Sequence, residues 1–363
     1  MKALSLFIGL VGPLPPPSGG MANQTLQLAK LLREENIAVE LIQVNRPYHP
    51  DWIGRFKGIR AAFRLVPYLA HLWRSAGRVQ LFHVMANSGW SWHLFAAPAI
   101  WVARIRGKPV IINYRGGEAD SFFNKSFSWI KPSLSKADAI VVPSGFLEGV
   151  FQKRGFSTSV VPNIIDLSRF KAGMRTSATD GSTSPHIIVT RNLEPIYDNA
   201  TALHAFSIIR RVFPTAKLTL AGSGPQREAL ETLAVTLGLA GAVTFTGRVD
   251  NEGMAALYRT ADVMINPSLA DNMPISVLEA LASGVPVVST NVGGVPFLVE
   301  HEKTALLVPE RSPEAMADAV LRLLNDSSKA KLMREAGIES VQQYAWSNVR
   351  ERLLEVYTKV MAK

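Results

Sequence analysis

Two carboxylates, Asp271 and Glu279, stand eight positions apart in the segment NPSLADNMPISVLEALASGVPVV, which spans residues 266–288. Asp271 precedes a predicted helix, and Glu279 lies about a turn and a half inside it. A carboxylate in the second position can accept a pair of hydroxyl hydrogens, as a ribose offers them. We therefore expect Glu279 to bind a ribose and Asp271 to lie on the side that a second sugar occupies.

The elements that must position these acids follow from the same region. Residues 263–265 predict a short buried strand that Asn266, Pro267 and Ser268 interrupt. A helix follows, with Pro274 at its first position, Gly284 at its end and apolar residues at helical spacing. Residues 285–289 predict the next strand, which is parallel to the first because a helix crosses between them.

This strand, loop and helix predict a binding site for an anion. In an open parallel sheet, ligands bind beyond the carboxyl ends of the strands, so the loop 268–273 should face a ligand. The unpaired N–H groups and the dipole of the helix favour an anion such as a phosphate at its start. The residues expected to contact it are Asn272, Met273, Pro274 and Ile275.

The segment resembles the retaining glycosyltransferases of family 4, which have the GT-B architecture. Their signature is Glu, seven residues, Glu, then Ala and small residues that lead to Gly-x-Pro-Val. Here Asp271 is followed after seven residues by Glu279-Ala280, and then by Gly284-Val285-Pro286-Val287. The Asp keeps the charge but reaches roughly 1.5 Å less far than a Glu, a distance that matters for productive geometry. The simpler alternative is that Glu279 only decorates an exposed helix face.

Further matches to this family lie in the first half of the chain. Gly19-Gly20 opens the predicted helix 21–33 and resembles a Gly-Gly pair that family members place near the donor diphosphate, although a tight strand-to-helix turn is a nearly equal alternative. Family members usually carry a histidine and then a glycine where this chain has Arg115-Gly116. We therefore expect Arg115 to contact a leaving phosphate or a carboxylate-bearing sugar through its planar fork.

The second half lacks two cations that the family uses to neutralise the diphosphate leaving group. Matching the segment HIIVTRNLEPIYDN places Asn192 at the family's arginine and Tyr197 at its lysine. Arg191 lies one residue earlier, where a strand would point it to the opposite side. If the cationic support is retained, Arg191 or Arg115 must supply it. Gly222 opens the family's GxGP turn, and Arg248 follows a strand whose next loop lies near the nucleobase.

The resemblance covers nearly the whole chain and implies an α/β fold of the GT-B type, with two Rossmann-like domains whose parallel sheets face a central cleft. It places an acceptor domain at residues 1–168, with the last helix, about 345–363, packing back on it. A polar segment without periodicity, 169–185, predicts a linker. The nucleotide-sugar domain is expected at residues 186–344.

Charge is distributed unevenly along the 363 residues. Residues 1–165 hold 19 Lys and Arg against 8 Asp and Glu, whereas residues 166–363 hold 20 against 21. In the segment 55–78, basic residues alternate with aromatic and aliphatic ones around Pro67, which breaks the pattern midway. Such a helix can lie on an anionic membrane surface, and a solvated basic face over a packed helix is the alternative.

Composition narrows the remaining possibilities. The absence of cysteine excludes disulfides, thiolate metal sites and cysteine nucleophiles. His83 and His93 stand ten apart without nearby acids, so we expect them to be satisfied or at the surface, with no metal and no cofactor. Two long uncharged stretches, 3–29 and 79–103, are interrupted by Pro, Gly or polar residues, so we predict no transmembrane helix. We expect a cytoplasmic protein that associates peripherally with the inner face of a membrane.

These observations predict a metal-independent retaining glycosyltransferase that moves a sugar from a UDP- or GDP-sugar to an unidentified acceptor, such as a lipid-linked or polysaccharide precursor. One alternative is a degenerate member that binds a sugar or nucleotide without turnover, motivated by the departures at Arg115, Asn192, Tyr197 and Asp271. A nucleotide-sugar epimerase shares the architecture, but its acid and histidine set is not evident. Nucleic-acid binding explains only the charge, and no nucleic-acid partner is expected.

Overall fold

The computed structural model describes residues 6–16, 19–48, 52, 56, 60–173 and 184–363. The chain forms two compact units, Met1–Asn163 with Val349–Lys363, and Ile164–Asn348. The first unit thus ends at Asn163 rather than at residue 168, and the returning segment begins at Val349 rather than at residue 345. Most of the predicted linker, residues 174–183, lies outside the described residues.

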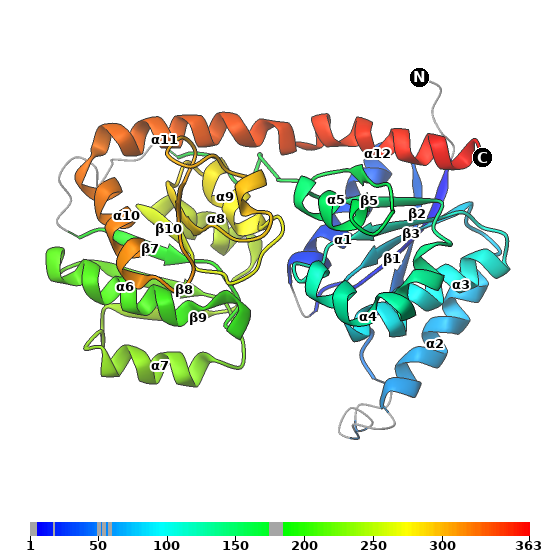
Figure 1. The fold of residues 1–363 in the computed structure, drawn as a ribbon, viewed down its shortest axis with the longest axis horizontal. Coiled ribbons are helices and arrows are strands. Elements are labelled where there is room, and N and C mark those ends of the chain that lie inside the picture. Colours follow the sequence, from blue (N-terminus) through cyan, green and yellow to red (C-terminus); the bar gives the residue numbers. More distant parts are fainter. Residues whose placement is uncertain (1–5, 17–18, 49–51, 53–55, 57–59, 174–183) are drawn as a thin grey trace. The chain divides into compact units, whose positions relative to one another are not determined.

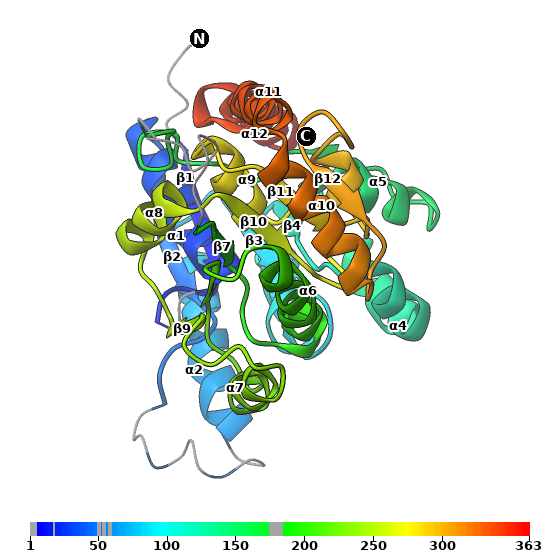
Figure 2. The same cartoon turned by 90° about the vertical axis from the view of Figure 1, so that its left-hand side faces the viewer.

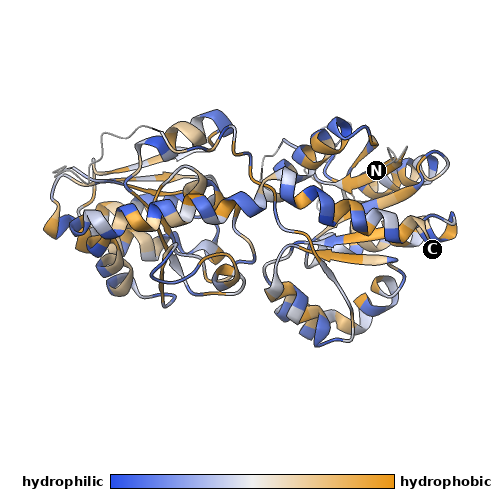
Figure 3. Ribbon diagram, turned by 90° about the horizontal axis from the view of Figure 1, so that it is seen from above, coloured by the Kyte–Doolittle hydropathy of each residue, from blue (hydrophilic) through white to orange (hydrophobic). Residues whose placement is uncertain are grey.

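The first unit is built on a six-stranded sheet in the order β2-β1-β3-β4-β5-β6, in which every pair is parallel. Helices cover both faces of such a sheet, so its central strands read as continuous apolar runs, and Figure 3 shows these strands as largely hydrophobic. The strands are β1 (Phe7–Gly12), β2 (Ala38–Gln43), β3 (Leu81–Ala86), β4 (Val110–Tyr114), β5 (Ala139–Val142) and β6 (Ser159–Val160).

The helices of the first unit surround this sheet, with α2 and α3 packed against each other (Figure 1). The described helices are α1 (Gly20–Glu34), α2 (Arg60–Ser75), a π-helical turn η2 (Trp92–Ala96), α3 (Ala97–Ile105), α4 (Ala119–Leu134), α5 (Gly145–Gln152) and most of α12 (Trp346–Met361). The expectation that Pro67 breaks the basic segment is wrong, because α2 continues through it. The exposed proline removes one backbone hydrogen bond, but Tyr68 and Leu72 still bury their side chains on the inner face.

The second unit carries another six-stranded parallel sheet, in the order β12-β11-β10-β7-β8-β9. Figure 2 shows α6 and α10 side by side over this sheet, where their apolar faces pack together. The strands are β7 (His186–Val189), β8 (Lys217–Ala221), β9 (Val243–Gly247), β10 (Val263–Asn266), β11 (Val287–Thr290) and β12 (Leu306–Val308). The helices are η4 (Pro195–Tyr197), α6 (Asn199–Val212), α7 (Arg227–Thr236), α8 (Asn251–Thr260), α9 (Ile275–Ala282), η5 (Val295–Phe297), α10 (Pro313–Asn325), α11 (Ser327–Ser340) and η6 (Val341–Tyr344).

The predicted strand, loop and helix around the two carboxylates are present as β10 and α9. Pro274 is the residue before the helix rather than its first residue, with φ −65° and ψ 117°. Gly284 ends the helix as predicted, because its φ of +68° is a left-handed conformation that favours glycine. Within the described ranges, no helix is both long and apolar enough to cross a lipid bilayer.

Candidate functional site

The centre of the candidate site is an ion pair between Arg191 and Asp271. Nη2 of Arg191 donates to Oδ2 of Asp271 across 2.7 Å, and the two side chains are only 10% and 12% exposed. Nη1 of Arg191 donates to the Ser276 hydroxyl at 3.2 Å. The guanidinium carbon lies 4.0 Å from the centre of the Tyr197 ring, at cation–π distance. The positive charge is therefore fixed at the start of α9.

Arg191 reaches this place because it lies beyond the strand. We expected a strand to direct its side chain to the opposite side, and that expectation is wrong, since β7 ends at Val189. Side-chain alternation applies only within a strand, so the turn that follows is free to aim Arg191 at Asp271. A buried asparagine, Asn199, donates to the backbone oxygen of Asn192 at 3.0 Å and holds this turn in place.

The loop that carries Asp271 is supported from behind by two glycines. The backbone N–H of Gly294 donates to the backbone oxygen of Asp271 at 3.0 Å. A Cβ on Gly294 would lie 1.9 Å from the backbone oxygen of Asn272, and one on Gly293 would lie 2.1 Å from the backbone oxygen of Asp271. Only glycine permits so close an approach of two backbones, so Gly293 and Gly294 fix the position of the backbone that carries Asp271.

Glu279 lies inside the same unit, half-buried under Tyr258. The Tyr258 hydroxyl is 3.1 Å from Oε2 of Glu279, 3.0 Å from the backbone oxygen of Ser276 and 2.8 Å from the Thr190 hydroxyl. Burial raises the pKa of Glu279 to about 7, against the opposing effects of the Tyr258 hydrogen bond and the Arg169 and Arg191 charges. The carboxyl is consequently poised between its two protonation states near neutral pH.

The other expected contacts of this unit are placed around that pair. Asn272, Met273 and Pro274 are buried in the loop, and Ile275 begins α9. Asn192 and Arg248 are exposed, in the turn after β7 and in the loop after β9. Gly222 has a backbone role, because a Cβ there would lie 2.1 Å from the Arg191 oxygen. It therefore fixes the turn that carries Arg191.

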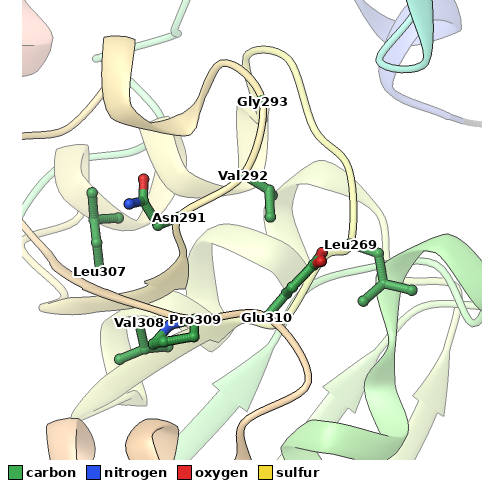
Figure 4. A pocket seen from close by; sticks show the side chains of 8 residues that line it. All are labelled: Leu269, Asn291, Val292, Gly293, Leu307, Val308, Pro309 and Glu310. Atoms are coloured by element: carbon green, nitrogen blue, oxygen red, sulfur yellow. The ribbon is translucent and has the colours of Figure 1, made fainter. Parts of the chain in front are cut away.

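A hollow of about 530 Å³ opens beside the Asp271 loop, at the carboxyl ends of β10, β11 and β12 (Figure 4). Its wall combines apolar side chains with the backbone of the glycine turn and one carboxylate, Glu310. This is the edge of a parallel sheet at which ligands bind. The lining residues are Leu269, Asn291, Val292, Gly293, Leu307, Val308, Pro309 and Glu310.

Three expected site residues belong to the first unit. Arg115 follows β4, donates from Nε to Asn113 Oδ1 at 3.1 Å and from Nη1 to Asn163 Oδ1, and burial lowers its pKa to about 10. Gly19 precedes α1 and Gly20 begins it, and a Cβ on either would meet no described atom within 4 Å. The glycines therefore leave open space at the start of α1, where a ligand could approach the backbone.

The two histidines singled out from the sequence differ in burial. His83 is fully buried and bonded at both ring nitrogens, as expected of a satisfied histidine, whereas His93 is half-buried. Among the described residues, no group of three His, Asp or Glu side chains is arranged to hold a metal ion.

The structure brings together Arg191, Tyr197, Asp271 and Glu279. Arg191 donates to the Ser276 hydroxyl, and the Tyr258 hydroxyl lies between the Ser276 backbone oxygen and the Glu279 carboxylate. Sequence reasoning missed Ser276, Tyr258, Thr190 and Asn199. Ser276, Thr190 and Asn199 had a signal, since each stands within three residues of an expected contact. Tyr258 had none, because an aromatic residue on an amphipathic helix normally belongs to the core. Together these groups can hold a phosphate beside a cation and a hydroxyl pair beside a carboxylate.

Two family models match the chain. Residues 18–169 match "Glycosyltransferase Family 4", and residues 184–326 match "Glycosyl transferases group 1". The GDP-mannose-dependent alpha-(1-6)-phosphatidylinositol monomannoside mannosyltransferase of Mycobacterium tuberculosis is 37% identical over 47% of this chain and 46% of its own length. The chain thus spans about half the length of that curated relative.

Two further proteins match over nearly their whole lengths. The phosphatidyl-myo-inositol mannosyltransferase of Mycobacterium leprae is 24% identical over 97% of this chain and 96% of its own. The solved structure of sucrose-phosphate synthase from Thermosynechococcus elongatus superposes with a TM-score of 0.80 at 22% identity, covering 98% of this chain and 99% of that one. The structural likeness establishes the same two-sheet fold.

Proposed function

Because the chain belongs to the family 4 glycosyltransferases and has the GT-B fold, we propose that it transfers a sugar from a nucleotide-sugar to an acceptor hydroxyl with retention of anomeric configuration. The observation that carries this proposal is the largely buried Arg191–Asp271 pair at the start of α9, with Glu279 one turn further along. The pair offers a cation to a pyrophosphate and a carboxylate to a sugar hydroxyl within one small region.

In this proposal Arg191 supplies the charge that Asn192 and Tyr197 lack. On donor binding, the pyrophosphate would approach the amides at the start of α9 and share Arg191 with Asp271. Tyr197 would keep the guanidinium in place through its ring face. Glu279 would accept hydrogen bonds from the two ribose hydroxyls. The role of Asp271 would be to hold a hydroxyl of the transferred sugar.

The transfer would depend mainly on positioning and on stabilising the departing diphosphate. As the bond between the anomeric carbon and the diphosphate oxygen breaks, the acceptor oxygen forms a bond on the same face. The diphosphate oxygen that leaves would take up the acceptor proton. Arg191 fills the role of the positive charge on the leaving group, so no metal ion takes part in the proposed reaction.

The donor to test first is GDP-mannose, which the name of the Mycobacterium tuberculosis relative specifies, followed by other GDP- and UDP-sugars. The names of the Mycobacterium tuberculosis and Mycobacterium leprae relatives both include a phosphatidylinositol-type lipid. This directs the search for the acceptor to inositol-containing lipids. Such acceptors lie in membranes, and the first unit presents a surface suited to one. Exposed apolar side chains cover the outer sides of α2 and α3, namely Phe63, Val66, Trp73, Trp101 and Ile105.

Basic residues accompany that surface, which we call the α2–α3 face. The Arg106 guanidinium lies 4.8 Å from the centre of the Trp73 ring, and Arg74 is exposed beside it. Aromatic side chains among cations suit the interface of an anionic membrane. We propose peripheral attachment through this face, on the cytoplasmic side where nucleotide-sugars are available.

Purified protein should be incubated with a panel of nucleotide-sugars and inositol lipids, and the products analysed by mass spectrometry and NMR. We expect release of the nucleoside diphosphate and an axial or equatorial product linkage that matches the donor. An inverted linkage would contradict retention. Binding without turnover, unaffected by Asp271→Ala, would identify a non-catalytic member. Inversion at one carbon of the donor sugar, without transfer to an acceptor, would identify an epimerase.

A further inference from the structure

We propose that His83 and Tyr357 are positioning residues for Arg115, which they hold through Asn113 in a buried chain of hydrogen bonds. The chain runs from α12 across β3 and β4 to the end of the sheet, entirely inside the first unit. Arg115 Nε donates to Asn113 at 3.1 Å, the Asn113 amide nitrogen lies 3.0 Å from His83 Nε2, and His83 Nδ1 lies 2.8 Å from the Tyr357 hydroxyl.

The sheet register explains why these side chains meet. β3 pairs with β4 so that His83 stands opposite Ile111. Side chains alternate along a strand, and Asn113 therefore points to the same face as Ile111, with Arg115 two positions further on. Tyr357 approaches that face from α12, where it is fully buried. A polar row thus lies in what is otherwise an apolar layer.

The direction of every bond in the row follows from Arg115. A guanidinium can only donate, so the Asn113 atom that faces Nε must be its oxygen, and the amide nitrogen must donate to His83 Nε2. His83 consequently carries its proton on Nδ1 and donates it to the Tyr357 oxygen. A neutral imidazole agrees with the pKa of His83, which burial and the Arg115 charge lower to about 3.

Arg115 is held from a second side by Asn163, which accepts from Nη1. Asn163 is the last residue of the unit before the chain leaves it, and Tyr357 lies eight residues after Val349, where the chain returns. The guanidinium is therefore fixed by both segments that connect the two units. These bonds use Nε and Nη1 and leave Nη2, within the described part of the chain, for a ligand.

The inference rests on the proposed function for its consequence, because a fixed Nη2 matters only if Arg115 meets the donor. Its structural part can be tested without a donor. In Tyr357→Phe the His83 Nδ1–H loses its acceptor, and the row loosens. We expect hydrogen exchange of the Arg115 Nε–H to accelerate about fivefold or more, equivalent to the loss of one net hydrogen bond.

The experiment is 15N NMR of the full chain, with the Arg115 Nε–H assigned by its disappearance in Arg115→Lys. Tyr68→Phe is the matched control, since Tyr68 is a buried tyrosine of the same unit whose hydroxyl donates only to the Phe95 oxygen, at 2.7 Å. Tyr357→Phe should accelerate exchange of the Arg115 Nε–H and raise the donor KM or lower kcat. Tyr68→Phe should leave the exchange rate and the kinetic constants unchanged, even where it lowers the Tm as much as Tyr357→Phe does.

Unchanged exchange at Arg115 in Tyr357→Phe would overturn the inference, as would an equal acceleration in Tyr68→Phe. If Tyr357→Phe fails to fold, the 15N shifts of His83 in the unaltered protein decide the matter, because an Nε2-protonated ring contradicts the row. A row that behaves as expected in a protein that turns over no nucleotide-sugar would refute the proposed function and leave the positioning of Arg115 intact.

Discussion

Arg191 and Asp271 share a hydrogen bond of 2.7 Å although 80 positions separate them in the chain. The carboxylate also accepts from the backbone N–H of Asn272, at 3.1 Å. The guanidinium retains one buried donor, Nε, without a partner among the described residues. The two bonds to Asp271 and Ser276 thus use two of the five guanidinium N–H groups, and the remaining N–H groups of Nη1 and Nη2 can donate to an incoming oxygen.

Removing one member of this pair should cost stability as well as turnover. In Arg191→Ala the Asp271 carboxylate stays buried without its cation, so we expect the free energy of unfolding to fall by about 3 kcal/mol. Loss of charge stabilisation should lower kcat about 100-fold or more. Denaturant unfolding and initial-rate kinetics measure the two effects.

The double variant Arg191→Ala/Asp271→Ala separates those effects. It should recover most of the stability, because no unpaired charge remains, but none of the turnover. Arg227→Ala is the control, since it breaks an ion pair with Glu231 whose side chains are 47% and 45% exposed. Its stability should change by less than about 0.5 kcal/mol. Turnover restored in the double variant would contradict the catalytic role of Arg191.

Donor affinity should depend on pH through Glu279. The folded pKa is about 7, raised by burial, so the carboxyl becomes protonated as the pH falls below 7. A protonated carboxyl can no longer accept both ribose hydroxyls, and Kd should rise towards about tenfold per pH unit below that value. Titration calorimetry between pH 5 and 8 tests this, and in Glu279→Gln the dependence should disappear. An unaltered slope in that variant would assign the titration to another group.

The same shift has an opposite effect on the stability of the ligand-free protein. Because the folded pKa of Glu279 lies above its ordinary value of 4.5, the unfolded chain loses this proton first. The stability contributed by the protonated carboxyl is complete below about pH 4.5 and is lost as the pH rises through 7. Glu279→Gln should therefore become more stable relative to the parent protein as the pH rises across that window.

His83 should make the first unit sensitive to acid. Its folded pKa of about 3 lies below the ordinary value of 6.5, so the unfolded chain binds a proton that the folded unit does not. Stability should consequently fall as the pH drops below about 6.5, with a limiting slope of about 1.4 kcal/mol per pH unit from this group. Unfolding of the parent and of His83→Gln should be compared from pH 7 to 4, where Gln can both accept from Asn113 and donate to Tyr357. Parallel curves would exclude His83 as the source.

Gly294→Ala should displace the Asp271 loop. The added Cβ would lie 1.9 Å from the Asn272 oxygen, a contact that neither backbone can relieve without moving. We expect a loss of about 1–3 kcal/mol in stability and at least a tenfold weaker donor affinity. Gly149→Ala, inside α5 where a Cβ meets nothing within 4 Å, should instead stabilise the protein by up to about 1 kcal/mol. Equal donor affinity in the two variants would contradict the supporting role of Gly294.

Membrane attachment should depend on the α2–α3 face. Phe63→Glu/Val66→Glu places two charges where two apolar side chains are 49% and 65% exposed, and binding to vesicles of phosphatidylglycerol and phosphatidylcholine should fall at least tenfold. Val235→Glu, at a side chain that is 66% exposed on α7, should bind as the parent does. Co-sedimentation measures both. Retained binding in the double variant would point to another surface.

Much of the fold was predictable because parallel strands and their crossing helices leave regular signals. The strands predicted at residues 263–265 and 285–289 are present as β10 and β11, since short apolar runs bounded by turn residues indicate strands. The prediction for Pro67 failed because it weighed the proline alone and not the burial of Tyr68 and Leu72.

The site was less predictable than the fold. Composition and spacing selected Asp271 and Glu279, but the direction of Arg191 depends on where β7 ends, a boundary that sequence patterns do not fix. The surroundings of Arg115 needed tertiary information of another kind. Asn113 could have been placed by alternation, yet Tyr357 comes from the far end of the chain, and no local pattern connects it to His83.

The turn after β7 has a consequence for how related proteins are sorted into active and inactive ones. A scan that scores fixed alignment columns would find an amide at Asn192 and a phenol at Tyr197 and set this chain aside as a pseudoenzyme. In the proposed site the cation is instead supplied one column earlier by Arg191, and the Tyr197 ring of the second column lies against it. Judgements about missing functional residues should therefore compare where charged groups lie in the structure, and not only which residue stands at each aligned position.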